Sequence, residues 1–368
     1  MFDRRLLKSG QVVMVGTSLD APGGMTAVVR LYQAMGLFER WQVLYLSSYD
    51  TPRMLAQMRV MGGAVLTFIG LLLRGRVSLL HVHSASRGSF WRKSLFCALA
   101  RLFRVPYIFH LHSGEFPVFY RDECGPLGQR WVSLTLCRAA RVVALTSSWR
   151  AALEQIAPSA QITVLGNPVA LVGTLPPAPA ERRHVLFLGR LRDKKGVYDL
   201  VRAMPVVLAQ VPQARFTLAG DGDLAGTAAL ARELGVEAAL HLPGWVDGSD
   251  KDQLLASADV LVLPSYFEGL PICVLEAMAL GIPVVSTNVG GIPEVLDQGR
   301  CGILLTPGDI PSLSQAILQL LQEPARGEQL RLAAFERVTK FYSTTAVLKA
   351  LDDLYAPFLS SSVSGQEF

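Results

Sequence analysis

The stretch Leu263–Glu276 reads LPSYFEGLPICVLE, and its pattern decides the fold that the sequence predicts. The run Asp259–Leu263 has the length and the apolar content of a buried strand. After it, Leu270–Leu280 predicts a helix, with Pro271 at the first helical position, where a missing N–H is harmless. A buried strand followed by a loop and a helix is the unit from which α/β sheets are built.

The loop between this strand and helix suits an anion that is flanked by hydroxyl groups. Gly269 opens the turn, so backbone amides at the helix start can approach an anion closely. Glu268 lies in the loop, and Glu276 lies about two turns into the helix at ~3.6 residues per turn. The helix start therefore suits a diphosphate and the carboxylates suit hydroxyls on either side, which is the combination that a nucleotide-sugar needs.

The sequence EGLP at 268–271, with a second Glu at position 276, resembles the EX7E signature of retaining glycosyltransferases of the GT-B fold, family 4. The resemblance implies that Glu268 holds the hydroxyls of the donor sugar and that Glu276 holds the ribose hydroxyls. It also implies that backbone groups of Gly269, Leu270 and Pro271 meet the donor. Without the resemblance, the two glutamates would be interpreted as a capping carboxylate and a solvated helix residue.

A basic loop follows the apolar strand that is predicted at His184–Leu188. The run GRLRDKKG at 189–196 places charge between a strand and a helix, where it needs an anion or water. Arg190 offers a planar fork of donors and Lys195 a compact point charge, and together they suit a diphosphate. The run resembles the diphosphate-binding segment of the family-4 enzymes, which implies that both cations stabilise the leaving group. A solvated loop is the alternative.

Two further segments of the second half bear on the nucleotide and on metal. Leu240–Val246 (LHLPGWV) resembles the family's base-binding segment, in which backbone groups around Val246 read the nucleobase edge. Asp221-x-Asp223 matches the DxD motif of metal-dependent glycosyltransferases, but a Gly-rich turn after a strand is the plainer account of GDGD. Because the basic loop would supply the charge of a metal, we predict neither a metal nor a cofactor.

A Gly-containing loop opens the first half of the chain. It connects a predicted strand at Gln11–Gly16 to a predicted helix at Met25–Leu37 and contains Gly23 and Gly24. Such an opening brings backbone amides against a phosphate or a sugar ring. The loop resembles the family's first Gly pair, which implies that Gly23 and Gly24 touch the donor diphosphate and sugar.

A histidine loop follows the strand predicted at Pro106–Leu111, at the end where open α/β sheets bind ligands. HLHSGEF resembles the His-Gly loop of the family, which implies that His112 faces the reacting sugar. Family members more often have Gly directly after the His, whereas here Ser113 intervenes. His81, His83 and His110 are expected as strand residues, and their alternation along separate strands lacks a metal-ligand spacing.

Two apolar segments of the first half raise the question of a membrane. Val60–Leu73 is fourteen residues without a charge, short of the ~20 that a spanning helix needs. We expect a buried helix, with a monotopic segment as the alternative. Arg87–Arg104 has apolar residues at helical spacing and five cations, and predicts a core helix whose basic edge, including Arg87, Arg92 and Lys93, could face a membrane.

Charge is divided unevenly along the chain. Through Val172 there are 19 Lys and Arg against 8 Asp and Glu, a net +11, whereas the remainder is −6. A basic half suggests an anionic lipid, a nucleic acid or a phosphorylated acceptor, with solvated arginine as the alternative. The five cysteines read as buried thiols of a reducing compartment. The apolar run Val12–Val15 is too short for a signal-peptide core. We therefore expect a cytoplasmic protein.

The alternation of strands and helices predicts an α/β chain with two doubly wound, Rossmann-like sheets. We expect a first domain at 1–172, a Pro-rich linker at 173–183, a second domain at 184–342, a helix at 343–358 that crosses back onto the first domain, and a frayed tail at 359–368. The resemblance to the GT-B proteins implies that the two domains face a cleft.

The resemblance implies a retaining, metal-independent hexosyltransferase that uses a GDP- or UDP-sugar. No enzymic nucleophile is evident, which fits the family's front-face mechanism. The basic first half favours a glycan or polyprenyl-diphosphate-linked acceptor in cell-surface polysaccharide assembly, at the inner face of the cell membrane, and no nucleic acid. A nucleotide-sugar 2-epimerase of the same fold and a non-catalytic glycan- or lipid-binding protein are the alternatives.

Overall fold

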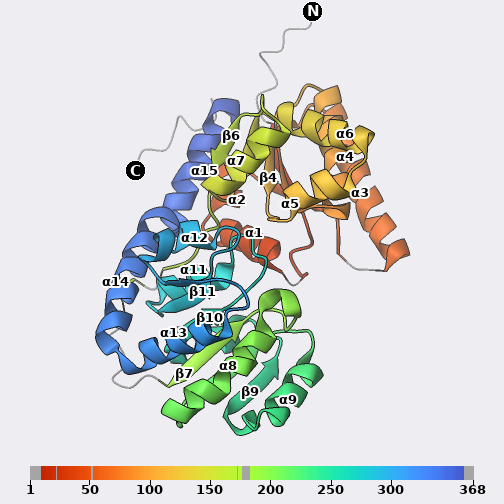
Figure 1. The fold of residues 1–368 in the computed structure, drawn as a ribbon. Helices are drawn as coiled ribbons and strands as arrows, with labels where there is room; N and C mark the ends of the chain where they lie inside the picture. Colours follow the sequence, from red (N-terminus) through yellow and green to blue (C-terminus); the bar gives the residue numbers. More distant parts are fainter. Residues whose placement is uncertain (1–9, 22, 51–52, 172, 176–182, 360–368) are drawn as a thin grey trace, which may run out of the picture. The chain divides into compact units, whose positions relative to one another are not determined.

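The computed structural model describes residues 10–21, 23–50, 53–171, 173–175 and 183–359. Contacts divide the chain into unit 1, Met1–Pro168 with Thr344–Phe368, and unit 2, Val169–Ser343. Each unit contains one parallel sheet of six strands with helices beside it (Figure 1). The expected α/β class with two doubly wound sheets is confirmed. Residues 176–182 of the expected linker and 360–368 of the expected tail lie outside the described residues.

The sheet of unit 1 has the strand order β2-β1-β3-β4-β5-β6. Its strands are β1 (Gln11–Gly16), β2 (Leu44–Ser47), β3 (Val77–Ser84), β4 (Tyr107–Leu111), β5 (Arg141–Ala144) and β6 (Ile162–Val164). Its helices are α1 (Gly24–Ala34), α2 (Leu37–Trp41), α3 (Met54–Leu73), α4 (Gly88–Leu102), α5 (Phe116–Val118), α6 (Pro126–Cys137), α7 (Ser147–Ile156) and α15 (Thr344–Leu359), with a π-helical turn at Phe119–Glu123. The strand order reverses between β1 and β3, so the carboxyl ends of these strands border the point where doubly wound sheets bind ligands.

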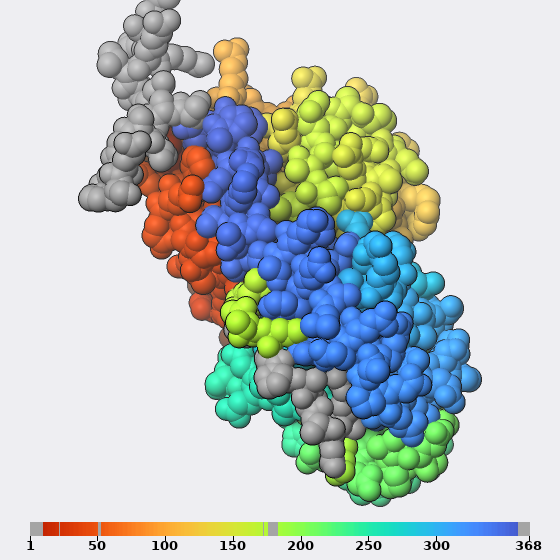
Figure 2. Space-filling model, turned by 90° about the vertical axis from the view of Figure 1, so that its left-hand side faces the viewer, coloured from red at the N-terminus to blue at the C-terminus, as the bar shows by residue number. Residues whose placement is uncertain are grey.

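Helix α15 returns the end of the chain to unit 1. Asp352 on α15 pairs with Arg40 at 3.0 Å and accepts a hydrogen bond from Trp41 Nε1 at 2.7 Å. Tyr355 on the same helix is fully buried and bonds His81 of β3. Figure 2 shows the blue α15 lying against the red N-terminal segment that contains α1 and α2. The expected crossing back onto the first sheet is therefore observed as packing within unit 1.

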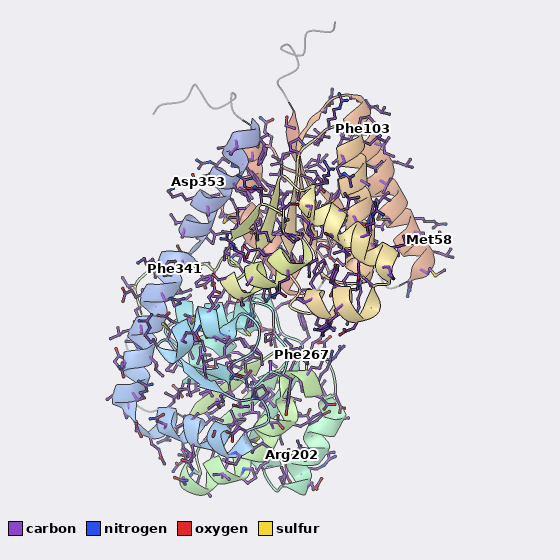
Figure 3. All side chains as sticks on the ribbon, turned by 45° about the horizontal axis from the view of Figure 1, so that its top comes forward. Met58, Phe103, Arg202, Phe267, Phe341 and Asp353 are labelled. Carbon is purple, nitrogen blue, oxygen red and sulfur yellow. The ribbon has the colours of Figure 1, made fainter. Side chains whose placement is uncertain are left out.

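Helix α3 differs from the prediction in length and in burial. It runs over Met54–Leu73, twenty residues, because the helix-forming residues 54–59 (MLAQMR) continue the helix before the uncharged run. Only Ala64, Phe68 and Leu72 are buried along it. It is long and apolar enough to cross a membrane, which is also true of many buried core helices. However, only 17% of its apolar 18-residue stretch is buried. Met58 on α3 points away from the unit 1 core (Figure 3). The expected buried helix was wrong.

Helix α4 corrects the predicted basic edge. It packs on α3 through Phe68 and Phe96, whose ring centroids are 5.5 Å apart. Lys93 is fully buried and faces the interior of unit 1. Arg87, just before the helix, pairs with Glu115 and Glu123. Of the three cations expected on one surface edge, one is internal and one is neutralised.

The sheet of unit 2 has the order β12-β11-β10-β7-β8-β9, which reverses between β7 and β10. Its strands are β7 (His184–Leu188), β8 (Arg215–Ala219), β9 (Leu240–Gly244), β10 (Val260–Leu263), β11 (Val284–Thr287) and β12 (Ile303–Leu305). Its helices are α8 (Val197–Gln210), α9 (Leu224–Glu233), α10 (Gly248–Ser257), α11 (Ile272–Ala279), α12 (Ile292–Val295), α13 (Ile310–Gln322) and α14 (Pro324–Phe341), with 3₁₀ turns at Asp193–Lys195, Glu237–Ala239 and Asp297–Gly299.

Helix α11 begins two residues later than predicted. Pro271 has extended backbone angles and is the N-cap, so Ile272 is the first helical residue. The buried face of the helix contains Val274, Leu275 and Met278, as expected from its apolar run. The start of the helix still lies directly after β10 and its loop.

Two glycines allow the loops at the carboxyl ends of β7, β10 and β11 to pack together. A Cβ atom at Gly196 would lie 2.0 Å from the Pro264 carbonyl oxygen, and a Cβ atom at Gly290 would lie 2.1 Å from that of Glu268. Both glycines have positive φ, +67° and +57°, which L side chains rarely adopt. These close approaches place Glu268 against the loop at Gly290.

Gly290→Ala should lower the free energy of unfolding by roughly 3 kcal/mol or more, because the new methyl group meets a carbonyl oxygen at a strained φ. Gly235→Ala is the matched control in unit 2, since Gly235 has φ +68° with nothing within 4 Å. The control should cost only the roughly 1–2 kcal/mol of the left-handed conformation. Urea denaturation measures both, and equal losses would contradict the close approach at Glu268.

Candidate functional site

The loops after β7 and β10 carry the catalytic residues predicted in unit 2. Because these two strands are neighbours where the order reverses, their carboxyl-end loops adjoin. Lys195 Nζ lies 2.6 Å from Glu268 Oε1. Ser265 Oγ donates to the same oxygen at 2.7 Å. The structure thus joins two residues to which the sequence assigned separate tasks.

The environment of this ion pair differs from that of a surface pair. The Glu268 side chain is 6% exposed and that of Lys195 is 29% exposed. Exposed ion pairs contribute little, whereas a buried carboxylate needs both charge and hydrogen bonds to offset its desolvation. Lys195 and Ser265 both donate to Oε1, so within the described residues Oε2 has no hydrogen-bond donor. Oε2 can therefore accept a hydrogen bond from a ligand hydroxyl.

A second Lys–Glu pair lies along α11. Lys251 Nζ of α10 is 2.6 Å from Glu276 Oε1, and both side chains are partly buried. The sequence reasoning missed Lys251, because its charged segment SDKDQ has the pattern of a solvated helix surface. Only the packing of α10 near β7 could have identified it.

The thiol of Cys273 lies close enough to both Lys–Glu pairs for their charges to affect its pKa. The pKa of its thiol is raised to about 12, mainly by burial and to a lesser extent by the carboxylates of Glu268 and Glu276. Both carboxylates therefore act on the first turn of α11. This helix start is flanked by one Lys–Glu pair from the loop and one from the helix.

Arg190 and the two aspartates of the DxD match have partners of their own. Arg190 Nε lies 3.1 Å from Asp221 Oδ1, with each side chain about half exposed. Asp223 caps α9 by accepting from Gly226 N at 2.9 Å, and it also accepts from the Tyr198 hydroxyl. These bonds hold the pKa of Asp223 below its usual value. Asp223 thus has a structural task that the motif match did not reveal.

The remaining predicted donor-binding residues of unit 2 lie in loops. Val246 is half-buried between β9 and α10. The Gly269 carbonyl accepts from Gly291 N at 2.8 Å, which ties its loop to the one after β11. Leu270 is buried and Pro271 caps α11. Among the described residues, no hydrogen bond joins Val246 to either Lys–Glu pair.

In unit 1, His112 and the Gly pair lie at the carboxyl ends of different strands. Gly23 has φ +148° and is the N-cap of α1, which begins at Gly24. His112 directly follows β4, and its backbone N–H donates to the Ser84 carbonyl at 2.8 Å. The interposed Ser113 places its hydroxyl 2.9 Å from that of Ser86, in the loop after β3.

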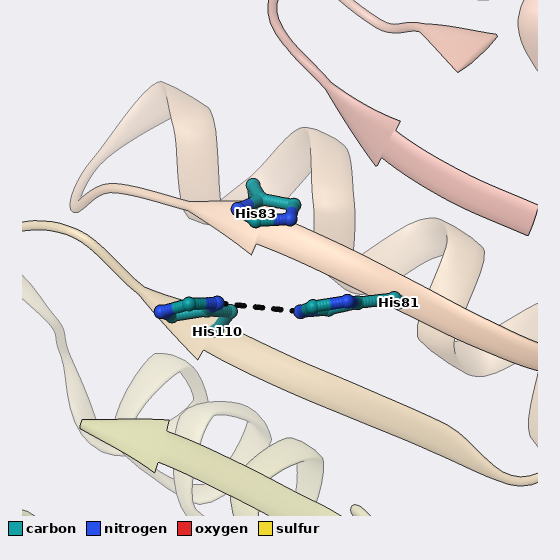
Figure 4. A group of neighbouring side chains, drawn as sticks. All are labelled: His81, His83 and His110. Carbon is teal, nitrogen blue, oxygen red and sulfur yellow. Dashed lines mark hydrogen bonds between the residues drawn. The ribbon is translucent and has the colours of Figure 1, made fainter. Parts of the chain in front are cut away.

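Four histidines form an array on one face of β3 and β4. Strand pairing sets His83 opposite His110, and Figure 4 shows His81, His83 and His110 side by side. His81 Nε2 lies 3.3 Å from His110 Nδ1, and His83 Nδ1 lies 2.8 Å from His112 Nε2. One ring nitrogen from each of His81, His83 and His110 lies within 4.8 Å of the other two. The three histidines are strand residues, as expected, and parallel pairing of β3 and β4 brings together side chains that have no metal-ligand spacing in the sequence.

Burial keeps the array neutral. Desolvation lowers the pKa of His81 and of His112 to about 3, with the charge of a neighbouring histidine or of Lys93 as the lesser cause. It lowers the pKa of His83 and His110 well below the usual value as well. A neutral His112 offers one donor and one acceptor and carries no charge at neutral pH.

Comparison with known protein families gives a match over most of the chain. Residues 7–168 match the model described as a glycosyl transferase 4-like domain. Residues 182–323 match the model described as glycosyl transferases group 1. The two matches fall on the sheets of unit 1 and unit 2 in turn.

Two curated relatives are similar over most of this chain. Glycogen synthase of Mycobacterium tuberculosis is 30% identical over 275 residues, which are 70% of this chain and 64% of that protein. The D-inositol 3-phosphate glycosyltransferase of an Arthrobacter species is 28% identical over 306 residues, 74% of this chain and 69% of that protein. The chain thus spans just under two thirds of the first relative's length.

Solved structures share the fold. Sucrose-phosphate synthase from Thermosynechococcus elongatus has a TM-score of 0.79 at 21% identity, covering 96% of this chain and all of that one. Anabaena HepE has a TM-score of 0.73 at 19% identity, covering 95% of this chain and all of that one. With two Rossmann-like units, the chain has the GT-B fold.

The histidine array should make unit 1 sensitive to acid. Each imidazole is neutral when folded and takes up a proton on unfolding below pH 6.5, so the free energy of unfolding should fall as pH drops from 6.5 toward 3. His110→Leu should flatten this dependence near pH 5 by about 1.4 kcal/mol per pH unit. Denaturation between pH 7.5 and 4.5 measures it. An unchanged slope in His110→Leu would refute the assignment.

Proposed function

We propose that the chain, whose two units match the models described as a glycosyl transferase 4-like domain and as glycosyl transferases group 1, moves a sugar from a GDP- or UDP-sugar to a glycan acceptor, with retention at the anomeric carbon. The observation that carries this proposal is the start of α11, which is flanked by the pairs Lys195–Glu268 and Lys251–Glu276. Anabaena HepE, which shares the fold, was solved with UDP and glucose, and this supports the donor class.

Charge on the leaving diphosphate is the main barrier that unit 2 has to lower. Arg190, Lys195 and the amides at Gly269 and Leu270 would stabilise that charge as the glycosidic bond breaks. Glu268 has two roles in this scheme. Its Oε1 fixes Lys195, and its Oε2 accepts a hydroxyl of the donor sugar. A single carboxylate would then couple sugar recognition to the position of the cation.

Recognition of the nucleotide would use the other side of the helix start. Glu276, already oriented by Lys251, would accept hydrogen bonds from the ribose hydroxyls. Backbone groups around Val246 would contact the nucleobase. Asp221 would release Arg190 toward the diphosphate, since their pair is half exposed and weak.

The acceptor side of the reaction would involve His112. We assign no enzymic nucleophile, and the leaving diphosphate would take the acceptor's proton on the same face of the sugar. His112 is neutral at neutral pH, so it would orient the reacting sugar by hydrogen bonding, with Gly23 and Gly24 near the donor diphosphate. No step requires a metal.

The acceptor class rests on unit 1, because the curated relatives are named for different acceptors. Helix α3 exposes Met54, Leu55, Met58, Leu66 and Leu73. Arg59, Arg74 and Arg76 are also exposed on or beside it. An apolar helix face with basic residues suits the surface of an anionic membrane. We therefore propose a lipid-linked acceptor, a role in cell-surface polysaccharide assembly, and a cytoplasmic protein peripheral to the inner membrane face.

The donor assignment predicts different effects for three variants. Calorimetry with UDP or GDP measures their nucleotide affinity, and an activity assay measures their turnover. Glu276→Ala should weaken binding of the bare nucleoside diphosphate by roughly 1.5–3 kcal/mol, the value of hydrogen bonds to a charged group. Lys195→Ala should lower turnover by on the order of 10²–10³. His112→Ala should lower turnover while leaving nucleotide affinity unchanged.

Glu237→Ala, an exposed residue of unit 2, is the control and should bind nucleotide as the parent does. A thermal-shift panel of GDP- and UDP-sugars first selects the donor, since a bound ligand stabilises by mass action. Activity in EDTA should equal that in Mn²⁺. Loss of nucleotide affinity in His112→Ala equal to that in Glu276→Ala would refute the division of tasks.

The membrane assignment predicts binding to anionic vesicles that weakens as salt rises, since exposed charge is screened beyond ~8 Å at physiological ionic strength. Replacing Met58 with Glu and Arg59 with Gln should reduce sedimentation with vesicles and leave UDP binding intact. Arg326→Gln, on unit 2, serves as the control. Equal sedimentation with neutral and anionic vesicles would count against the proposal.

A further inference from the structure

Lys93 is a buried cation that has no anionic partner in the part of the chain that the structure describes. Its side chain on α4 is 0% exposed, and among the described residues its ammonium donates only to Ser89 Oγ, at 3.2 Å. Within the described residues no carboxylate pairs with it. Burial and the nearby charge of Arg92 lower the pKa of Lys93 to about 7. One weak bond to a hydroxyl offsets little of the several kcal/mol that desolvating an ammonium costs.

Arg92, beside it, is also incompletely satisfied. Its Nε is buried and has no hydrogen-bond acceptor within the described residues. Its guanidinium lies over the Tyr49 ring, 4.8 Å from the centroid, and forms no ion pair with a described carboxylate. Burial lowers the pKa of Arg92, and the charge of Arg92 adds to the effect of burial in lowering the pKa of Lys93.

The pair lies at the ligand-binding end of the unit 1 sheet. Ser89 accepts from Lys93 and also from the backbone N–H of Ala85, the residue after β3. The hydroxyls of Ser86 and Ser113 meet in the two adjoining loops at 2.9 Å. This end of β3 borders the point where the strand order reverses. The cations are thus set where an open sheet receives a ligand.

The histidine array invites a metal as the ligand instead. His83 Nε2 and His110 Nε2 are buried and have no partner in the described chain, and a transition metal binds such nitrogens. However, the Lys93 charge already acts on His83 and His112. A divalent cation would add charge beside an ammonium and a guanidinium, and no described carboxylate would offset it. An anion removes the repulsion that a metal would increase.

We propose that Lys93 and Arg92, with the hydroxyls of Ser86, Ser89 and Ser113, form a binding site for a phosphate or diphosphate group of the acceptor. The identification with the acceptor rests on the proposed function, whereas the anion site itself does not. Arg92 supplies a planar fork and Lys93 a point charge, the two forms of cation that phosphate groups prefer. Stability lost to the buried charges is recovered when the ligand binds.

The test uses the full chain and its Lys93→Met variant. Calorimetry measures inorganic pyrophosphate in the presence of saturating UDP or GDP, which occupies unit 2. The parent should bind pyrophosphate, and Lys93→Met should bind it roughly thirtyfold or more weakly, as expected for loss of one member of a buried charge pair. Without ligand, Lys93→Met should melt at or above the parent's temperature, because a buried unpaired charge is gone.

Lys349→Met is the matched control, since Lys349 is an exposed lysine of unit 1. Farnesyl diphosphate, tested in parallel, should bind more tightly than pyrophosphate and show the same dependence on Lys93. Pyrophosphate that is displaced by UDP or GDP would assign the site to the donor and overturn the proposal. Unchanged binding in Lys93→Met would overturn it as well.

Arg92→Gln keeps the test valid if Lys93→Met fails to fold. This half-buried residue should weaken pyrophosphate binding on its own, and unchanged binding would refute its role. A variant that melts well below the parent, together with a parent that binds no pyrophosphate, would show that Lys93 is only structural. Failure of nucleotide binding in unit 2 would contradict the proposed function and leave the pyrophosphate measurement intact.

Discussion

The ion pair between Lys195 and Glu268 is the interaction on which the candidate site of unit 2 depends. It joins the loops after β7 and β10, which meet only because the strand order reverses between these strands. The loops reach each other because Gly196 and Gly290 have no side chains where carbonyl oxygens pass. With Glu268 at 6% exposure, loss of Lys195 would leave a buried carboxylate uncompensated. The ion pair therefore depends on the strand order and on the two glycines, and the buried Glu268 depends on the ion pair.

The two units solve the problem of buried charge in opposite ways. In unit 2 the cations that border α11 each have a carboxylate, so the free protein is electrostatically balanced. In unit 1, Lys93 and Arg92 have none among the described residues, and the adjoining histidines remain neutral. A balanced site can exchange its internal partners for a ligand at small net cost. An unbalanced site gains more from an anion but costs stability without one.

The sequence predicted what depends on local pattern. Strands β1 and β7 have the expected bounds because each is an apolar run ended by glycine or a basic loop. The loop residues Arg190, Lys195 and Glu268 were predicted because motif and strand end coincide. Lys251 was missed, and Lys93 was placed on the wrong side of α4, since a charged residue in a helical pattern does not reveal what packs on it. The histidine array was missed because register between strands is set by tertiary pairing.

Helix α3 shows why apolar content alone could not decide burial. Its period leaves Ala64, Phe68 and Leu72 against unit 1, and Phe68 contacts Phe96 of α4. The opposite face keeps large apolar side chains in the solvent, a cost that a soluble core helix would not have. The helix beneath α3 is the one that carries Lys93. An exposed apolar face and an unpaired buried cation on adjacent helices of one unit match the two ends of a lipid phosphate, so the proposals for the membrane and for the anion site explain each other's unfavourable feature.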